Sequence, residues 1–346
     1  MAGNSNHVQL DNATLSFFKD ENTRITISVL YMVITVINLV GNVPSMWILL
    51  FRTSPKTVSI IFMIHLTLTD LALGVALPLQ IAYQLYGYHW TFGSGMCRLL
   101  FIVSPNSFMT LVFYTNMYCS ILTMMAISID RYLGIVKPMR FKQARKKKST
   151  AVLSCILMWV LVLAVLYPLM TTDLTFEVPQ YEITTCFDVL KKNMLPSTEA
   201  WAAFLFGMVV ILFLFPFCIT TFCYVSVIRK LTRHSRTGQK RIAVRLASVV
   251  LLVFILCFTP NNVLLLVHSV LRLFYGQSVY TAYKLSLCFS CLNSCLDPFI
   301  YYLASRDFRQ KLCLTLYNRL ILRIVSHVTV KGDAIRASFS VLSQFL

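Results

Sequence analysis

The sequence predicts an all-α membrane protein, a bundle of seven transmembrane helices with an amphipathic eighth helix. Of its 346 residues, 57% are hydrophobic and only 13% are charged. A soluble domain of this size cannot bury so much apolar surface. Seven apolar stretches each exceed the ~20 residues that a helix needs to cross a bilayer. Lys and Arg gather in the short connections between these stretches, as they do in membrane proteins.

The apolar stretches predict where each element lies. We expect membrane-spanning helices over 25–50, 58–83, 95–136, 150–170, 199–229, 242–270 and 281–303. The corresponding domains are an extracellular N-terminus (1–24), a seven-helix domain (25–303), an amphipathic helix (304–317) and a cytoplasmic tail (318–346). Proline lacks an N–H and can kink a helix. The first, second, fourth, fifth, sixth and seventh spans carry Pro44, Pro78, Pro168, Pro216, Pro260 and Pro298.

The basic residues predict the orientation. Most of them follow the first, third, fifth and seventh spans, which places the C-terminus in the cytoplasm and the N-terminus outside. The formal charge of +18 therefore reflects a multi-pass protein of the plasma membrane, and no binding to nucleic acid is expected. Asn12-Ala13-Thr14 is an N-glycosylation sequon on the extracellular side of this topology.

Two of the eleven cysteines, Cys97 and Cys186, lie where the chain meets extracellular water. The outside is oxidising, so we predict a disulfide between them; the alternative is two free thiols. Cys313 lies in the amphipathic stretch after the seventh span, and this stretch should lie along the inner leaflet. Cys313 is therefore a candidate for palmitoylation, although an unmodified cysteine fits the sequence equally well.

Polar residues inside the spans mark a second candidate site, because intramembrane charge is costly. Asp70 lies in the second span and Asp297 in the seventh. Asn116 and Ser120 are four residues apart and so share a helix face, as do Asn293 and Asp297. These oxygens form a cluster suited to a small cation such as sodium. The alternative is a hydrogen-bonded cluster that holds one proton and no ion.

The inner end of the third span carries Asp130-Arg131-Tyr132. Arg131 needs a partner at a membrane face, and Asp130 is its neighbour. An ion pair there could break when another protein docks, which would make it a switch. The alternative is a static pair that anchors the end of the helix.

In order along the chain, these motifs make the sequence resemble the rhodopsin-like (class A) G-protein-coupled receptors over about residues 25–317. The matching motifs are Gly41-Asn42, Leu66 to Asp70, Asp130-Arg131-Tyr132, Trp159, Pro216 with Tyr224, Cys257-Phe258-Thr259-Pro260 and Asp297-Pro298-Phe299-Ile300-Tyr301. The stretch "HWTFG" and the Asp before Pro298 are similar to the purinoceptor-type branch.

The resemblance implies a receptor that binds an extracellular small molecule and activates heterotrimeric G proteins. It places Asp70, Asn116, Ser120, Asn293 and Asp297 in the family's sodium pocket. The residues that it implies in the activation switch are Asp130, Arg131, Tyr132, Tyr224, Phe254, Phe258, Pro260 and Tyr301, with Ile121 and Pro216 in the core packing. It favours the G12/13 class of G protein, with Gi as the alternative, and arrestin as a further partner. Sodium is the only cofactor it implies.

One departure from the branch concerns the ligand. Nucleotide-binding members carry Tyr-His after the proline of the sixth span and a basic residue one turn later, whereas this chain has Asn261, Asn262 and Leu265. Phosphate recognition favours fixed Arg or Lys. We therefore expect a ligand with an anionic head and an apolar tail. Its candidate binding residues are Tyr114, Tyr118, Asn262, Arg272 and Lys284. The alternative is that the basic residues only solvate the rim.

Two further departures concern the outer end. No cysteine occurs in residues 1–50 or 270–280, so the second outer disulfide of the branch is absent. Cys97 and Asp130 are 33 positions apart, about nine more than in the family, which would add ~13 Å to a helix. The extra residues lie near 99–108. They form a protruding helix, form an extra loop, or are an artefact of the gene model.

Other functions remain as alternatives. A nucleotide or peptide receptor of the same fold that couples to Gi is one. A transporter or channel is another, but it would show inverted repeats or a polar stripe through several spans, and neither is visible. An enzyme is not expected, because the sequence has no nucleophile–base pair or metal-ligand spacing.

Overall fold

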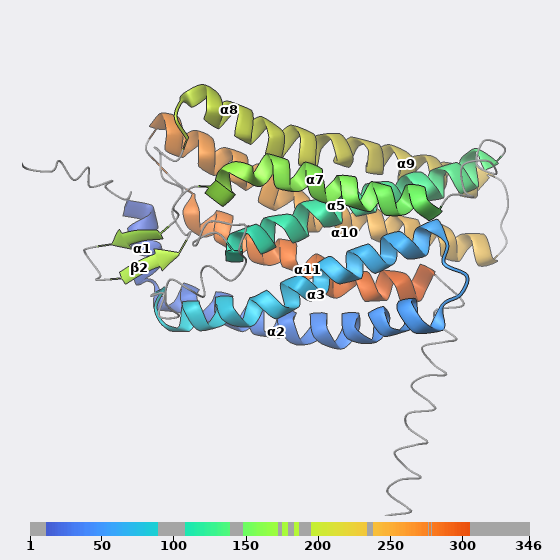
Figure 1. The fold of residues 1–346 in the computed structure, drawn as a ribbon, viewed down its shortest axis with the longest axis horizontal. Helices are drawn as coiled ribbons and strands as arrows, with labels where there is room; N and C mark the ends of the chain where they lie inside the picture. The colour runs from blue at the N-terminus through green and yellow to red at the C-terminus, as the bar shows by residue number, and fades with distance from the viewer. Residues whose placement is uncertain are drawn as a thin grey trace, which may run out of the picture.

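The computed structural model describes residues 12–88, 108–138, 148–171, 175–178, 183–186, 195–233, 238–275, 277 and 279–304. Seven long helical segments run side by side along the molecule (Figure 1). They are α2 (Glu21–Trp47) continued by η1 (Ile48–Arg52), α3 (Val58–Leu85), α5 (Phe108–Val136), α7 (Lys148–Thr171), α8 (Thr198–Phe206) continued by η2 (Gly207–Leu214) and α9 (Phe215–Arg233), α10 (Gly238–Val270) continued by η3 (Leu271–Tyr275), and α11 (Tyr280–Ala304).

These segments confirm the predicted fold class, a seven-helix membrane bundle. Six of them are long and apolar enough to cross a membrane. The seventh, α11, has 25 residues but is less apolar, because it carries Ser, Asn and Asp side chains that face the interior of the bundle. The predicted start of the third span (95–107) and the amphipathic helix after residue 304 lie outside the described residues.

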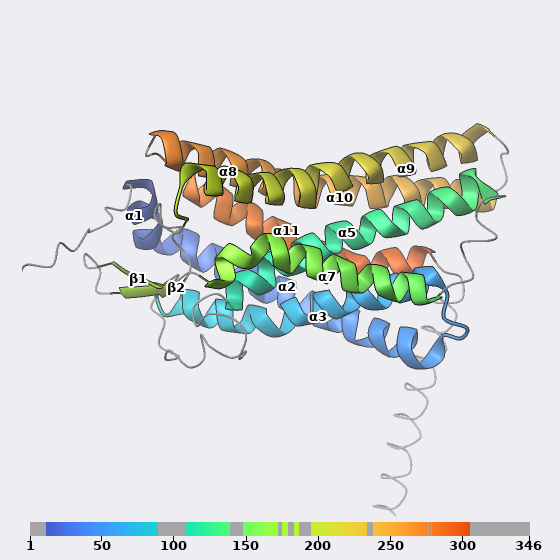
Figure 2. The ribbon, with the colours of Figure 1, turned by 45° about the horizontal axis from the view of Figure 1, so that its top comes forward.

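Two small elements at one end of the bundle were not predicted. Strands β1 (Thr175–Val178) and β2 (Ile183–Cys186) form an antiparallel hairpin in which Thr175 pairs with Cys186. Helix α1 (Asn12–Lys19) precedes α2. Both lie at the same end of the molecule in the two views (Figures 1 and 2), which we call the α1 end. Asn12, the predicted glycosylation site, begins α1.

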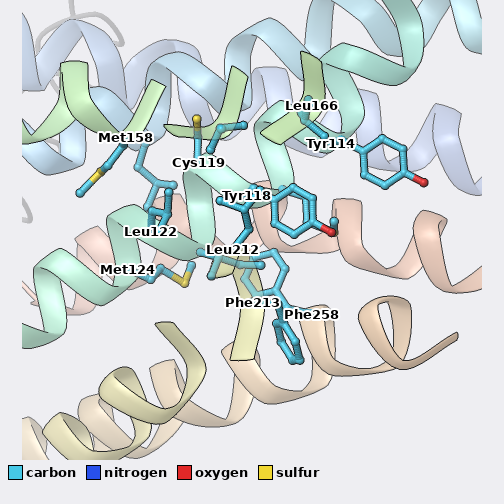
Figure 3. Close-up of a cluster of buried hydrophobic side chains, with 14 of the residues drawn as sticks. Tyr114, Tyr118, Cys119, Leu122, Met124, Met158, Leu166, Leu212, Phe213 and Phe258 are labelled. Atoms are coloured by element: carbon cyan, nitrogen blue, oxygen red, sulfur yellow. The ribbon is translucent and has the colours of Figure 1, made fainter. Parts of the chain in front are cut away.

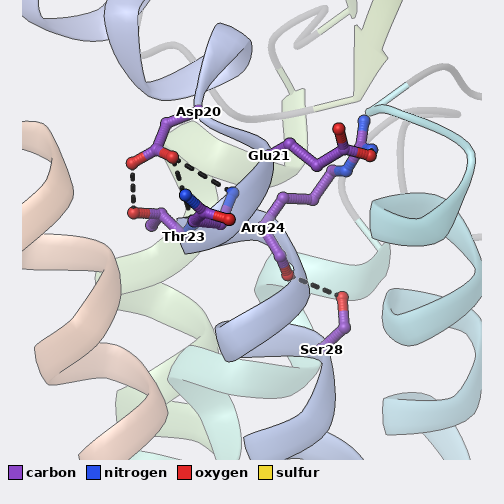
Figure 4. Close-up of polar contacts among 6 residues, drawn as sticks. Asp20, Glu21, Thr23, Arg24 and Ser28 are labelled. Carbon is purple, nitrogen blue, oxygen red and sulfur yellow. Dashed lines mark hydrogen bonds and ion pairs between the residues drawn. The ribbon is translucent and has the colours of Figure 1, made fainter.

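Asp20 fixes the corner between α1 and α2 (Figure 4). One carboxylate oxygen accepts the N–H groups of Asn22 at 3.1 Å and Thr23 at 3.3 Å, and the other accepts the Thr23 hydroxyl at 2.5 Å. These bonds satisfy N–H groups that the first turn of a helix cannot use. The Thr23 hydroxyl, followed by the Thr23 N–H, lowers the pKa of Asp20. Arg24 pairs with Glu21 at 2.8 Å on the same turn.

The fifth span departs from α-helical geometry at η2, which precedes Pro216. Proline has no N–H to donate to the carbonyl of Leu212, four residues earlier. The N–H of Phe215 instead bonds to the carbonyl of Val210, five residues earlier. A wide π-type turn of this kind inserts one extra residue into the helix.

Helices α2 and α11 approach each other closely at Gly41 and Pro298. A Cβ atom on Gly41 would lie 2.9 Å from the Pro298 ring, and the ring cannot move as a flexible side chain could. We expect Gly41→Val to destabilise the folded receptor domain by ~1–3 kcal/mol, the usual cost of overpacking. The measurement is the melting temperature of the purified protein in detergent. Gly134→Val, at an exposed position on α5, is the control; equal losses in both variants would contradict the prediction.

Candidate functional site

The polar cluster forms midway along the bundle, between α3, α5 and α11. Asp70 and Asp297 are 0% and 1% exposed, and their carboxyl groups lie within hydrogen-bonding reach of each other. The amide of Asn116 donates to Asp70 at 3.3 Å, and that of Asn293 donates to Asp297 at 3.0 Å. Ser120 is fully buried one turn after Asn116. The structure thus brings four of the five predicted residues together and places Ser120 one turn further along α5.

Several oxygens in this cluster have no hydrogen-bond partner among the described residues: Asp70 Oδ2, Ser120 Oγ and Asn293 Oδ1. Two buried carboxylates side by side are costly unless a proton or a cation neutralises them. Carboxylate, hydroxyl and amide oxygens are also the donors that hard cations prefer. The residues present therefore fit a small cation.

Sequence reasoning missed how α2 joins this cluster. The amide of Asn38 donates to the Asp70 carbonyl at 2.9 Å and to the Ser294 hydroxyl at 2.8 Å. The amide of Asn42 donates to the Ser294 carbonyl at 2.8 Å. Asn38 and Asn42 are four residues apart, so their helical spacing could have indicated a shared polar face.

A second site lies nearer the α1 end, between α5, α10 and α11. Tyr114 and Tyr118 stack one turn apart, with ring centroids separated by 6.2 Å (Figure 3). The hydroxyl of Tyr114 is hydrogen-bonded to that of Tyr283, and the hydroxyl of Tyr118 donates to Asn262 Oδ1 at 3.2 Å. Asn262 also donates to the Phe258 carbonyl at 2.9 Å. These side chains are all buried, so they form a packed floor that links three helices.

Asn261 is part of the same floor. Its amide donates to the sulfur of Met117 at 3.1 Å, and its oxygen accepts the Ser286 hydroxyl at 3.3 Å. Sequence reasoning treated Asn261 only as a missing tyrosine. In the structure it joins α10 to both α5 and α11.

Basic side chains stand between this floor and the α1 end. His268 stacks on Tyr283 with centroids 5.4 Å apart and an interplanar angle of 8°. Lys284 lies over the Tyr280 ring, with Nζ 5.4 Å from its centroid. Arg272 is partly exposed in η3. Sequence reasoning missed Tyr280 and Tyr283, although their spacing of three places them on one face of α11.

Further from the α1 end, the rings of Phe258, Phe254 and Phe217 pack one against the next, and we call these three rings the aromatic ladder. Phe254 packs edge-on against Phe258 at 5.4 Å and lies 6.0 Å from Phe217 of α9. Both Phe254 and Phe258 are fully buried, as is Ile121. A change at Asn262 can therefore reach the α9–α10 contact through adjoining rings. Pro260 lies within α10, two residues after Phe258.

At the end opposite α1, the predicted ion pair between Asp130 and Arg131 is not found in the described part of the chain, where Glu21 with Arg24 forms the only one. Asp130 instead accepts the Ser59 hydroxyl of α3 at 2.5 Å. Neighbouring residues on a helix point in different directions, and Arg131 lies where it interacts electrostatically with Tyr224. Tyr132 packs against Phe222 at 5.7 Å.

The sequence profile described as "7 transmembrane receptor (rhodopsin family)" matches residues 41–301. The chain belongs to this family. The receptor is 49% identical to purinoceptor 8 of Gallus gallus over 314 residues, which are 90% of this chain and 85% of that protein. It is 48% identical to the S-geranylgeranyl-glutathione receptor of Homo sapiens, over 87% of this chain and 82% of the relative. Proteinase-activated receptor 2 of Homo sapiens is 39% identical, over 87% and 74% of the two chains.

The family confirms the resemblance found in the sequence. The protein is a class A G-protein-coupled receptor of the purinoceptor 8 branch, a multi-pass protein of the plasma membrane that takes an extracellular ligand and couples to G proteins. Its relatives are signalling receptors, not enzymes, and the transporter or channel alternative is set aside.

Some predicted sites remain predictions. Cys97, Cys313 and the extra residues near 99–107 lie outside the described residues. Cys186 is in β2, whereas its predicted disulfide partner, Cys97, is outside the described residues. The disulfide therefore stays a prediction. Tyr301 lies in α11, and its side chain is not among those described.

Proposed function

We propose that this receptor binds an anionic molecule with a long apolar tail at the α1 end, and that it activates a G12/13-class G protein. The observation that carries the proposal is the placement of basic side chains directly above a buried aromatic floor. His268 stacks on Tyr283, and Lys284 lies one residue further along α11. The human relative, 48% identical, is named as a receptor for S-geranylgeranyl-glutathione, a peptide with carboxylates joined to an isoprenoid chain.

The head of such a ligand would bind the basic groups. Carboxylates form their stronger hydrogen bonds with charged donors. Lys284 and Arg272 offer such donors at one end of the bundle, and the His268 ring lies beside them. The position one turn after Asn261 holds Leu265, which is buried, where a nucleotide receptor would want a cation. The residues present therefore favour carboxylates at the rim over phosphates held deep in the bundle.

The tail would contact the rings of the floor. Tyr114, Tyr118 and Phe258 present apolar faces, while their polar atoms are already bonded to protein partners. Apolar ligand pockets with a few placed polar groups are the usual arrangement. A tail that separates Tyr118 from Asn262 would loosen α10 from α5. The aromatic ladder would carry that change to Phe254.

Activation would end at the opposite end of the bundle, with α10 moving away from α5. Arg131 and Tyr224 would then rearrange, together with Tyr301, and Asp130 would leave Ser59. This end faces the cytoplasm in the proposed topology, which follows from the basic loops. The G12/13 class is proposed from the resemblance, with Gi as the alternative and arrestin as a further partner.

Sodium is proposed as an allosteric ion at the polar cluster. Asp70, Asn116, Ser120, Asn293 and Asp297 would hold it. The unpartnered oxygens of Asp70, Ser120 and Asn293 support a cation more than a closed hydrogen-bond network. Its single positive charge would offset the charge of one of the two buried carboxylates while α3, α5 and α11 keep the arrangement described here.

The test of the ligand is G-protein dissociation in cells, with S-geranylgeranyl-glutathione as the probe. We expect the probe to activate a G12/13 protein through the wild-type receptor. Lys284→Gln should lower its potency at least tenfold, because a hydrogen bond to a charged group contributes ~1.5–3 kcal/mol. Lys19→Gln, which changes an exposed lysine of α1 at the same end of the bundle, is the matched control and should keep wild-type potency.

Three outcomes would contradict the proposal. Activation by a nucleotide but not by the probe would mean that the receptor recognises phosphates although Leu265 stands where nucleotide receptors carry a basic residue. Equal potency losses in Lys284→Gln and Lys19→Gln would mean that Lys284 acts only through the total positive charge at this end of the bundle and makes no specific contact with the ligand. Dissociation of Gi alone would replace the G12/13 assignment while leaving the ligand in place.

A further inference from the structure

The N-terminal helix α1 presents two large apolar side chains to the bundle. Phe17 is 2% exposed and Phe18 is 7% exposed, although they lie outside the seven spans. Ser16 and Lys19, their neighbours in the helix, are exposed. An isolated helix of eight residues is not stable in water, so the burial of these two rings is what holds α1 in place.

Their partners come from α11 and from the turn that follows α3. The Phe17 ring lies edge-on to Tyr280 of α11, with centroids 4.9 Å apart, and 5.4 Å from Tyr88, which follows α3. The Phe18 ring lies edge-on to Tyr88 at 5.2 Å. Tyr88 packs in turn against Tyr83 at 5.7 Å. Edge-on contacts at these distances are the favoured geometry of aromatic pairs.

Tyr280 connects this aromatic group to the proposed ligand site. Its ring lies 5.9 Å from that of His268 and beneath the ammonium group of Lys284. His268 stacks on Tyr283, which bonds to Tyr114. Phe17 is therefore two ring contacts away from a basic group at which we place the ligand's head.

A disulfide bond cannot join the N-terminal segment to the start of the seventh span, since residues 1–50 and 270–280 contain no cysteine. The corner at Asp20 sets the direction in which α1 leaves α2, and α1 also contacts α11. Ring contacts therefore provide a non-covalent attachment of the N-terminal segment to the start of the seventh span.

We propose that Phe17 and Phe18 are positioning residues of the ligand site: they fasten α1 across the outer end of the bundle and hold Tyr280 where it orients His268 and Lys284. This inference rests on the proposed function for its effect on ligand binding, but not for its effect on α11.

The experiment compares the full-length receptor with Phe17→Ala/Phe18→Ala and with Ser16→Ala, an exposed control on the same helix. Hydrogen–deuterium exchange is measured on the purified receptors, followed by mass spectrometry of the peptides covering 12–19 and 280–284. We expect faster exchange at 280–284 in the double variant, with no change at the far end of α11. The affinity for S-geranylgeranyl-glutathione should fall about tenfold. Ser16→Ala should change neither quantity.

Unchanged exchange at 280–284 together with faster exchange at 12–19 would overturn the inference, because α1 would then detach without affecting Tyr280. If the double variant does not reach the cell surface, Phe17→Leu/Phe18→Leu replaces it. Leucines keep apolar bulk but remove the ring contacts, so the same results are expected. If the probe fails to bind the wild-type receptor, the proposed ligand is wrong, and the exchange at 280–284 still decides the role of the two rings.

Discussion

Replacing Tyr118 with phenylalanine is expected to raise ligand-independent signalling about tenfold. In the structure the Tyr118 hydroxyl donates to Asn262, and this bond joins α5 to α10. Without it, the oxygen of Asn262 would be buried and unpaired, which costs ~1–3 kcal/mol. This cost destabilises the inactive arrangement, in which α10 is bonded to α5, and leaves the active arrangement, in which α10 has moved away, unaffected. A bias of this size corresponds to a roughly 5–150-fold change in a two-state equilibrium.

The measurement is basal G-protein dissociation at matched surface expression. Tyr114→Phe is the control, because the Tyr114 hydroxyl bonds to Tyr283 of α11 and leaves α10 untouched. We expect the control to keep wild-type basal activity. A rise in both variants, or in Tyr114→Phe alone, would show that the floor acts as a whole and that the Tyr118–Asn262 contact has no special role.

Replacing Asp70 with asparagine is expected to abolish the sodium dependence of ligand binding. If sodium occupies the polar cluster, the wild-type receptor should bind the probe about tenfold more weakly in sodium chloride than in choline chloride of equal ionic strength. The ion and the ligand would favour different arrangements, and linkage makes the effect reciprocal. Asp70→Asn removes one of the two carboxylates, so both salts should give nearly the same affinity.

Ser290→Ala is the matched control for this experiment. Ser290 is buried in α11 and bonds locally, to the Leu287 carbonyl, so its loss should leave the salt effect intact. If the wild-type affinity responds to pH but not to sodium, the cluster holds a proton instead of an ion. If Asp70→Asn keeps the full sodium effect, the ion binds elsewhere.

The amino-acid sequence was sufficient to predict the fold and the polar cluster, because long apolar stretches and helical spacing are visible without a structure. Seven apolar stretches predicted seven helical segments, because burial in lipid leaves few other choices for the backbone. The residues of the polar cluster were predicted from two signals: Asp70 and Asp297 are acids inside apolar spans, and Asn116 with Ser120 and Asn293 with Asp297 share helix faces through their spacing. The structure added their depth and their unpartnered oxygens.

The sequence was insufficient where a contact depends on the packing of distant segments. Asp130 and Arg131 are neighbours in the chain, and adjacency predicted a pair. On a helix, adjacent side chains diverge, and Asp130 meets Ser59 of α3 instead. Helix α1 was missed because it has only eight residues and lies within an N-terminal segment that is polar overall. Phe17 and Phe18 stand out only once Tyr88 and Tyr280 are placed around them.

The π-type turn η2 gives the fifth span a degree of freedom that a regular α-helix lacks. Each residue of an α-helix turns the chain by about 100°. Losing one residue within Gly207–Leu214 would restore regular geometry and rotate α8, while α9 keeps its contacts below Pro216. Related receptors could in this way present a different face of α8 to their ligands without altering α9, the half of the span that lies farther from the α1 end (Figure 1). A change in the number of residues within η2 could thus alter ligand specificity without changing the packing of α9.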